Sequence, residues 1–145
     1  MAQSERMPHT NRLRAIELLT SVPYGRVATS MRALPFLAVA RHVVTDGTLL
    51  LCMHAGYGYH EACNGSVVAY EADNFNSGAS VLWSVQATGE ARIVEPTDAE
   101  LELFGSGPAL IEGRPFEPVH MRIDPQFYLV HSMEGSVPRQ LQHTV

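Results

Sequence analysis

The sequence predicts a mainly β fold: a six-stranded antiparallel β-barrel with a few helices, built as one domain. Over the middle of the chain, apolar and polar residues alternate with the period of two that a strand imposes. Tight turn signals separate these segments, so strands that are neighbours in sequence are expected to pair antiparallel. One segment, residues 81–94, is long enough to curl between two parts of a barrel.

Length and composition fit a globular protein. The chain has 145 residues, which is enough for one domain over residues 1–145, with flexible ends expected at 1–9 and 139–145. The content of 46% hydrophobic and 17% charged residues excludes a disordered chain. The net charge of −5, without any basic run, argues against nucleic acid or an anionic membrane as a partner.

The same sequence predicts a cytoplasmic location. No apolar stretch approaches the roughly 20 residues that a membrane-spanning helix needs. The polar segment 1–12 lacks the apolar run of a signal peptide. In the reducing cytosol, the two cysteines Cys52 and Cys63 are not expected to form a disulfide.

The first expected element is a helix that starts at Arg12. Leu13, Ile16 and Leu19 recur at helical spacing. Pro23 ends the pattern, because the residue before a proline avoids the helical region.

Strands follow. Residues 26–30 and 37–44 have strand periodicity, and Asp46-Gly47 is a strong signal for a two-residue hairpin turn. Residues 48–54 are the returning strand. If the turn has two residues, consecutive pairing places His42 opposite Leu51, and His42 and His54 then point to opposite faces of the sheet.

A glycine loop at 55–58 leads into an expected short helix at 59–64. Residues 66–72 form the next strand, and 73–80, rich in Asn, Ser and Gly, form a loop.

The long strand 81–94 carries Gly89 in its middle, which predicts a bulge or a bend of the barrel. After it, Thr97 and Glu100 form a capping box that opens a helix, and Gly105 ends that helix. Each of these signals is local and has a direct physical cause.

The end of the domain is expected to close the barrel. Residues 107–118 are predicted to be an irregular connection. Two short closing strands are expected at 120–124 and 127–131, separated by Pro125.

Four segments carry a resemblance to a known family. They are GRVATS at 25–30, VAYEAD at 68–73, WSV at 83–85 and TGEA at 88–91, in the element order given above. Over about 18–104, the chain resembles the pyridoxamine 5′-phosphate oxidase-like, FMN-binding split barrels. The resemblance implies a six-stranded antiparallel split β-barrel, a homodimer with two flavins at the subunit interface, and oxidoreductase chemistry through FMN. Some relatives use the deazaflavin F420 or haem.

The resemblance also implies a cofactor site. By position, the flavin ring would lie along Arg41, His42 and Val43, with Trp83 and Ser84 near it from the long strand.

The resemblance places the flavin phosphate at the end of the third strand and in the loop after it. The implied binding residues there are His54, Gly56, Gly58 and Tyr59. Many flavin-binding members carry an Arg-Thr pair and then a Lys in this region, where this chain has Met53, His54 and Tyr59. Two fixed cations are therefore missing, and backbone N–H groups at the glycines are the alternative anion donors.

His54 has two interpretations. As a functional residue it would be a phosphate donor, a substrate ligand or an acid–base group, because the ordinary pKa of histidine is close to neutrality. As a structural residue it would be half-buried and bonded to the backbone. No catalytic side chain is identified, since a flavin can carry the chemistry itself.

Three hypotheses remain open. The first is a flavin-dependent oxidoreductase that uses FMN or F420. The second is a binding protein of the same fold that holds a non-flavin ligand, haem or a small acid, near His54. The third is a non-catalytic domain stabilised by zinc, because Cys52, His54, His60 and Cys63 are four plausible ligands.

Overall fold

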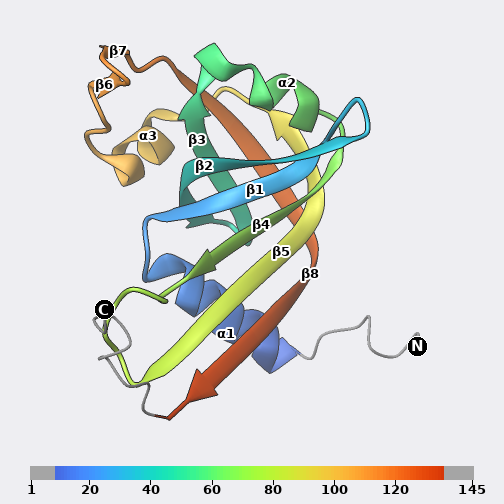
Figure 1. Ribbon diagram of the computed structural model, residues 1–145, viewed down its shortest axis with the longest axis vertical. Helices are drawn as coiled ribbons and strands as arrows, with labels where there is room; N and C mark the ends of the chain where they lie inside the picture. Colours follow the sequence, from blue (N-terminus) through green and yellow to red (C-terminus); the bar gives the residue numbers. More distant parts are fainter. Residues whose placement is uncertain (1–8, 136–145) are drawn as a thin grey trace, which may run out of the picture.

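The computed structural model describes residues 9–135 and contains one closed barrel with the strand order β1-β2-β3-β8-β5-β4 (Figure 1). All pairings around the barrel are antiparallel. The barrel strands are Tyr24–Met31 (β1), Leu34–Thr45 (β2), Thr48–His54 (β3), Val67–Asp73 (β4), Val81–Ile93 (β5) and Pro118–Glu134 (β8). The predicted six-stranded antiparallel split barrel is confirmed.

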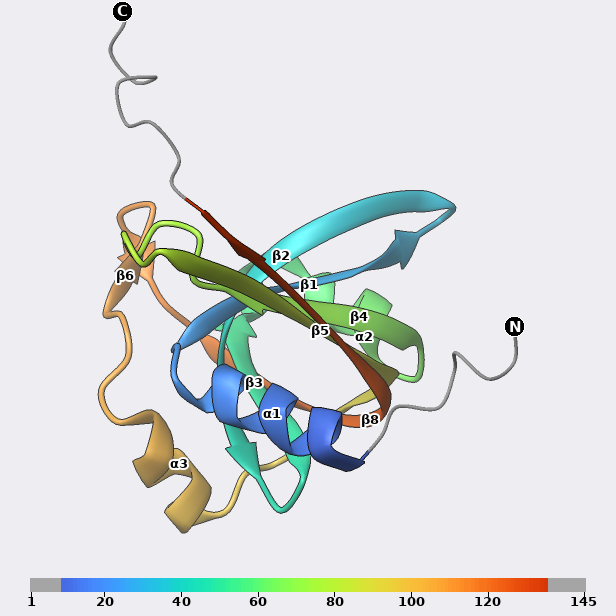
Figure 2. The ribbon, with the colours of Figure 1, turned by 90° about the horizontal axis from the view of Figure 1, so that it is seen from below.

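Helices cover the end and one side of this barrel. Helix α1 (His9–Thr20) lies across one end, as Figure 2 shows, and inserts Ala15, Leu18 and Leu19 into the core. The remaining elements are a 3₁₀ turn η2 (Ala55–Tyr57), α2 (Tyr59–Cys63), α3 (Asp98–Phe104) and the small hairpin β6 (Leu110–Ile111) and β7 (Arg114–Pro115). None of the helices in residues 9–135 is long and apolar enough to cross a membrane.

Two clusters of buried side chains hold the fold together. The larger one fills the barrel, where Tyr70, Tyr128 and Met121 are almost fully buried. The smaller one lies outside the barrel wall, where Phe104 of α3 packs on Leu50 and Cys52 of β3. Burial of apolar surface on this scale is the main favourable contribution to folding.

Several local predictions are confirmed. Asp46 and Gly47 both have positive φ, 51° and 77°, and His42 pairs with Leu51, as a two-residue turn requires. The Thr97–Glu100 capping box forms in both directions, with bonds of 3.1 and 3.0 Å.

The closing strand corrects the prediction of two short strands. β8 runs without a break from Pro118 to Glu134, because a register shift between Thr88 and Gly89 of β5 accommodates Pro125. Thr88 pairs with Phe127 and Gly89 with Pro125, which leaves Gln126 as the extra residue of a bulge. The proline therefore bends the strand at the bulge and does not divide it.

The first hairpin is longer than the sequence predicts. β1 and β2 pair as far as Met31 and Leu34, and Arg32 and Ala33 form the turn with φ of 54° and 68°. Turns of this hand usually contain Asn or Gly, so the residues gave no turn signal.

The ends of the chain differ in what can be compared. Helix α1 begins at His9, three residues before the predicted start, and so includes the last residue of the expected flexible lead 1–9. The rest of that lead and the expected flexible tail 139–145 lie outside the described residues. The expected irregular segment 107–118 contains the β6–β7 hairpin.

Candidate functional site

The outer face of β2 is unusually apolar. Leu37 and Val39 point away from the barrel and are 67% and 66% exposed, whereas Ala38 and Ala40, between and after them, are buried. Small residues thus face the interior and large ones face outward. This reverses the ordinary preference of a strand that has one solvent face, and it marks the outer face for contact with another molecule.

A hollow of about 350 Å³ lies at the carboxyl half of β2, between that strand and the ends of α1 and α3. Arg41, His42 and Val43 line it, as do Leu103 and Phe104. The guanidinium of Arg41 donates to the backbone oxygen of Phe104 and lies 5.5 Å from the centre of its ring. Arg41 therefore fixes the end of α3 beside β2.

A second hollow, of about 380 Å³, lies at the other half of β2 and is named the β2 groove here. It is lined by Leu37, Ala38, Val39, Met53, His54, Tyr57, Tyr59 and Glu112. Aromatic rings follow one another along it: Tyr59 stacks on Phe36 at 4.7 Å, and His54 meets Tyr57 edge-on at 5.1 Å. Such a lining suits a flat, mainly apolar ligand.

The hydrogen-bond partner of His54 determines which ring nitrogen carries the proton of the neutral side chain. Its Nδ1 accepts a 3.1 Å hydrogen bond from the backbone N–H of Glu117, so the proton of the neutral ring is on Nε2. A Cβ at position 56 would lie 2.9 Å from Cε1 of this ring, so Gly56 leaves the space that the ring fills. His54 is thus held by the backbone, and its Nε2–H is a donor.

His42 lies on the opposite, inner face, as the register predicts. The side chain is only 5% exposed, and its Nε2 donates to the Leu19 backbone oxygen at 2.7 Å. Its Nδ1 lies 2.5 Å from the hydroxyl of Tyr70, which is also 3.1 Å from the Ala40 oxygen. Burial lowers the pKa of His42. The side chain of His42 joins α1 to the barrel and is not available to a ligand. At this position, the prediction of a flavin ring along residues 41–43 therefore concerns the backbone alone.

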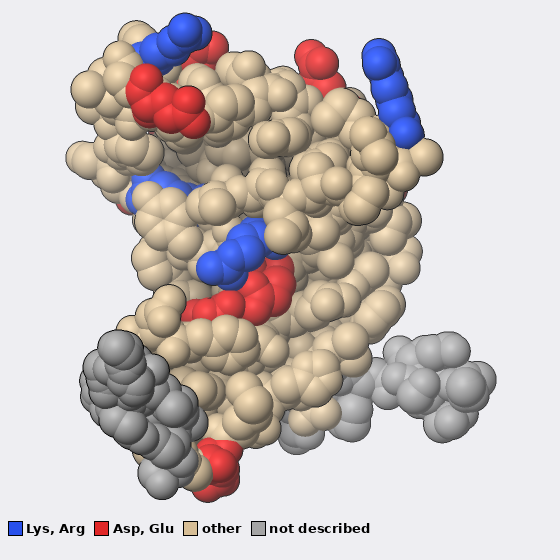
Figure 3. Space-filling model, viewed as in Figure 1, with Lys and Arg blue, Asp and Glu red and all other residues tan. Residues whose placement is uncertain are grey.

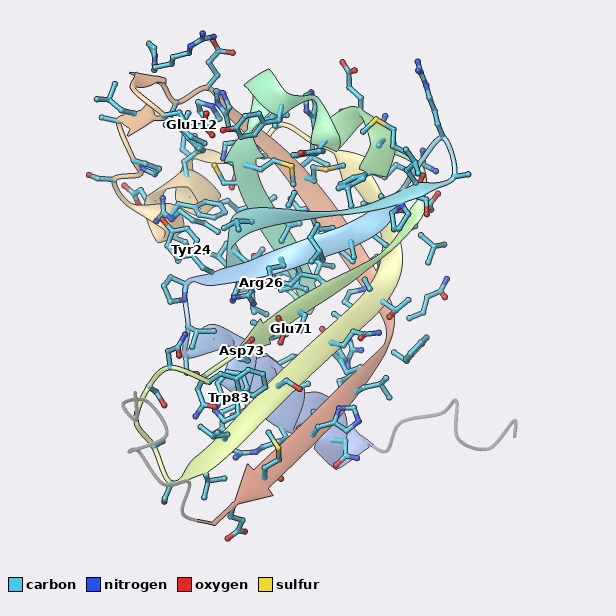
Figure 4. All side chains as sticks on the ribbon, viewed as in Figure 1. Tyr24, Arg26, Glu71, Asp73, Trp83 and Glu112 are labelled. Carbon is cyan, nitrogen blue, oxygen red and sulfur yellow. The ribbon has the colours of Figure 1, made fainter. Side chains whose placement is uncertain are left out.

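Trp83 and Ser84 point to opposite sides of β5. Trp83 is buried in the barrel core near α1 (Figure 4), and its backbone N–H donates to Asn74 at 2.7 Å. Ser84 is half-buried on the outside, between its register partners Asp73 and His131. The structure therefore does not bring the Trp83 ring to either hollow on β2.

The four residues considered as zinc ligands do not meet. Cys63 is fully buried inside the barrel, and Cys52 packs under α3 in the smaller cluster. Burial raises the pKa of both thiols, that of Cys63 to about 11, which disfavours the thiolate that binds metal. Within residues 9–135, no three His, Cys, Asp or Glu side chains are grouped as metal ligands.

Two polar contacts join residues that the sequence analysis did not connect. On the outer face of β1 and β4, Arg26 bonds Glu71 at 2.8 Å and Asp73 at 3.2 Å. Figure 3 shows these charges in an otherwise largely uncharged face, and Figure 4 identifies them. Strand alternation places Glu71 and Asp73 on one face of β4, and only the pairing of β1 with β4 brings Arg26 to them.

The two carboxyl groups of this set differ in pKa. Burial and the neighbouring Asp73 raise the pKa of Glu71. For Asp73, burial acts in the same direction but is outweighed by bonds from Glu71, the Phe75 N–H and Arg26, so its pKa is lowered. Asp73 therefore holds its negative charge to lower pH than Glu71 does.

The second unrecognised pair joins the β2 groove to the β6–β7 hairpin. The hydroxyl of Tyr57 donates to Oε2 of Glu112 at 2.5 Å, and this bond raises the pKa of Tyr57. The two residues are 55 positions apart, so only the folded chain shows that they meet.

Comparisons with known proteins agree with this geometry. A family model described as pyridoxamine 5′-phosphate oxidase matches residues 11–132. An uncharacterized protein of Mycobacterium tuberculosis is 36% identical over 91 residues, which span 59% of this chain and 59% of the length of that relative.

Solved structures with the same fold include two proteins that are named for FAD binding. The FAD binding protein from Mycobacterium smegmatis has a TM-score of 0.65 and 24% identity, with 88% of this chain and 98% of that chain covered. The one from Mesorhizobium loti has a TM-score of 0.63 and 16% identity, with 84% and 94% covered. At these identities the likeness shows the fold.

Proposed function

The chain belongs to the pyridoxamine 5′-phosphate oxidase family, and from this premise we propose that it binds a flavin on the outer face of β2. The observation that carries the proposal is the pair of hollows at the two halves of this strand, with exposed Leu37 and Val39 in the groove half. The proteins from Mycobacterium smegmatis and Mesorhizobium loti, named for FAD binding, support the same ligand class.

Each end of the proposed site has a distinct chemistry. At the carboxyl half of β2, the backbone of residues 41–43 borders the first hollow, and the family resemblance implies that the ring would lie there. At the groove half, Tyr57 and Tyr59 offer aromatic surface, and the Nε2–H of His54 offers a hydrogen-bond donor. A bound flavin would supply redox chemistry, and the residues of the chain would bind and orient it.

We expect Val39→Asp to weaken flavin binding at least about tenfold, because it places a carboxylate in an apolar groove. Titration of the purified full chain with FMN, FAD, F420 and haem, followed by absorbance and by flavin fluorescence, measures the affinities. Leu13→Asp is the matched control, since Leu13 is 54% exposed on α1 and lines neither hollow on β2. If haem binds and no flavin does, the non-flavin hypothesis replaces this one.

We also propose that two copies of the chain associate through the outer faces of β1, β2 and β4. Apolar side chains lie there in adjacent register rows, namely Ala28, Leu37, Val39, Val67 and Ala69. Val67 is 59% exposed, and the ion-paired side chains of Arg26, Glu71 and Asp73 lie on the same face. An apolar face with one charged group at its centre resembles the inner part of a protein–protein interface.

The dimer is tested by Val67→Asp, which puts a charge on this face outside both hollows on β2. We expect the variant to shift from dimer to monomer, with at least about a tenfold weaker association, because an unpaired charge would be buried on contact. Light scattering on a size-exclusion column measures the mass. A monomeric wild-type chain, or a Val67→Asp chain that stays dimeric like the Leu13→Asp control, would contradict the proposal.

A further inference from the structure

The β2 groove is closed at one side by a carboxylate. Glu112 is the only charged residue that lines this groove within the described chain, and the hydroxyl of Tyr57 holds it through the 2.5 Å bond. It stands at the tip of the β6–β7 hairpin, where φ is 50° for Glu112 and 78° for Gly113. The tight turn and the bond to Tyr57 together fix the position of the charge.

A third hollow, of about 400 Å³, lies beside the β2 groove and shares His54, Tyr57 and Glu112 with it. Its other charged residues are Glu117 and Arg114. The charged residues that line the β2 groove and this third hollow are Arg114, Glu112 and Glu117, so their formal charges sum to −1. A ligand arm that extends past His54 enters negative surroundings.

The polar groups that remain are suited to hydroxyl groups. Oε2 of Glu112 accepts from Tyr57, which leaves Oε1 to accept from a ligand, and His54, which also lines the groove, carries the proton of its neutral ring on Nε2. A hydroxyl both donates and accepts, so it can satisfy both. A phosphate dianion is an acceptor only, and it would be repelled by Glu112.

We propose that the β2 groove accepts the uncharged, hydroxyl-bearing arm of a ligand whose ring lies along residues 41–43, and that Glu112 is the residue that disfavours a terminal phosphate on that arm. The inference rests on the proposed flavin function and makes it more specific: riboflavin is preferred to FMN. Tyr57 acts as a positioning residue, because it keeps the carboxylate at the wall of the groove.

The test compares riboflavin with FMN by fluorescence titration of the full chain at low salt, where charge effects are least screened. We expect wild type to bind riboflavin at least about threefold more tightly than FMN, a ratio that suits an exposed charge. Glu112→Gln keeps the size and the bond to Tyr57 but removes the charge. It should bring FMN to within about twofold of riboflavin.

Glu102→Gln is the matched control, because Glu102 is an exposed carboxylate on α3 that lines neither the β2 groove nor the third hollow. It should leave both affinities unchanged. Tighter binding of FMN than of riboflavin by wild type would overturn the inference and leave flavin binding intact. So would a preference that Glu112→Gln does not alter. Failure of both flavins to bind would instead overturn the proposed function, and the inference with it.

Discussion

Gly89→Ala should destabilise the protein by about 3 kcal/mol, which is the upper part of the range for overpacking a well-packed site. The added methyl group would overlap the Asp124 carbonyl oxygen and lie 2.9 Å from Cα of Pro125. Both neighbours are backbone atoms, so neither can rotate away. The substitution therefore requires β5 and β8 to move apart at the bulge in their pairing.

Urea unfolding, followed by the fluorescence of the single Trp83, measures this loss as a shift of the midpoint at constant slope. Thr88→Ala is the control, because it changes the neighbouring residue, whose side chain is half-buried on the outer face. It should cost less than about 1 kcal/mol. If Gly89→Ala is as stable as this control, the close contact of the two strands at the bulge is wrong.

His42→Ala should also cost about 3 kcal/mol, because it leaves a cavity and removes the buried donor to the Leu19 oxygen. Tyr70→Phe removes only the hydroxyl, with its bonds to His42 and the Ala40 oxygen, and keeps the buried ring, so it should cost less, about 1 kcal/mol. Chemical unfolding near pH 8 gives both values. Equal stabilities of wild type and His42→Ala would contradict the structural role of this residue.

The same residue should make stability depend on pH. Because burial lowers its pKa below the ordinary value of 6.5, the unfolded chain takes up the proton more readily than the folded chain. The stabilisation is complete above pH 6.5 and decreases as the pH falls below that value. Burial also lowers the pKa of His120, which adds to the same slope.

Variants separate the two contributions. The contribution of His42 to the dependence of unfolding free energy on pH should remain in His120→Asn. The same contribution should be lost in His42→Ala. Measuring the unfolding free energy between about pH 5 and 8 with urea gives both slopes. A wild-type stability that rises as the pH falls through this range would show that the sign is wrong.

Much of the fold could be predicted because its signals are local. The Asp46-Gly47 turn, the Thr97–Glu100 capping box and the strand alternation each depend on a few adjacent residues and on backbone geometry that is nearly context-free. The β8 strand could not be predicted, because the bulge that accommodates Pro125 is shared with Gly89, which is distant in sequence.

The candidate site was predicted in part. The register placed His42 and His54 on opposite faces, and both histidines are where it puts them. The alternation along residues 81–94 fits a core position for Trp83, whereas the family resemblance put this ring near the flavin, and the structure places it in the core. The flavin, the dimer and the cytoplasmic location remain predictions.

By itself, the sequence determined most of the barrel strands, the Asp46-Gly47 turn and the family, since these follow from periodicity, from a short turn motif and from the residues that match the family model. Only the tertiary structure decided which side chains meet. The contacts of Tyr57 with Glu112, of Arg26 with Glu71, and of His42 with Tyr70 join residues 28 to 55 positions apart. Barrel closure brings these residues together, and no local pattern encodes where a closed sheet places its distant strands.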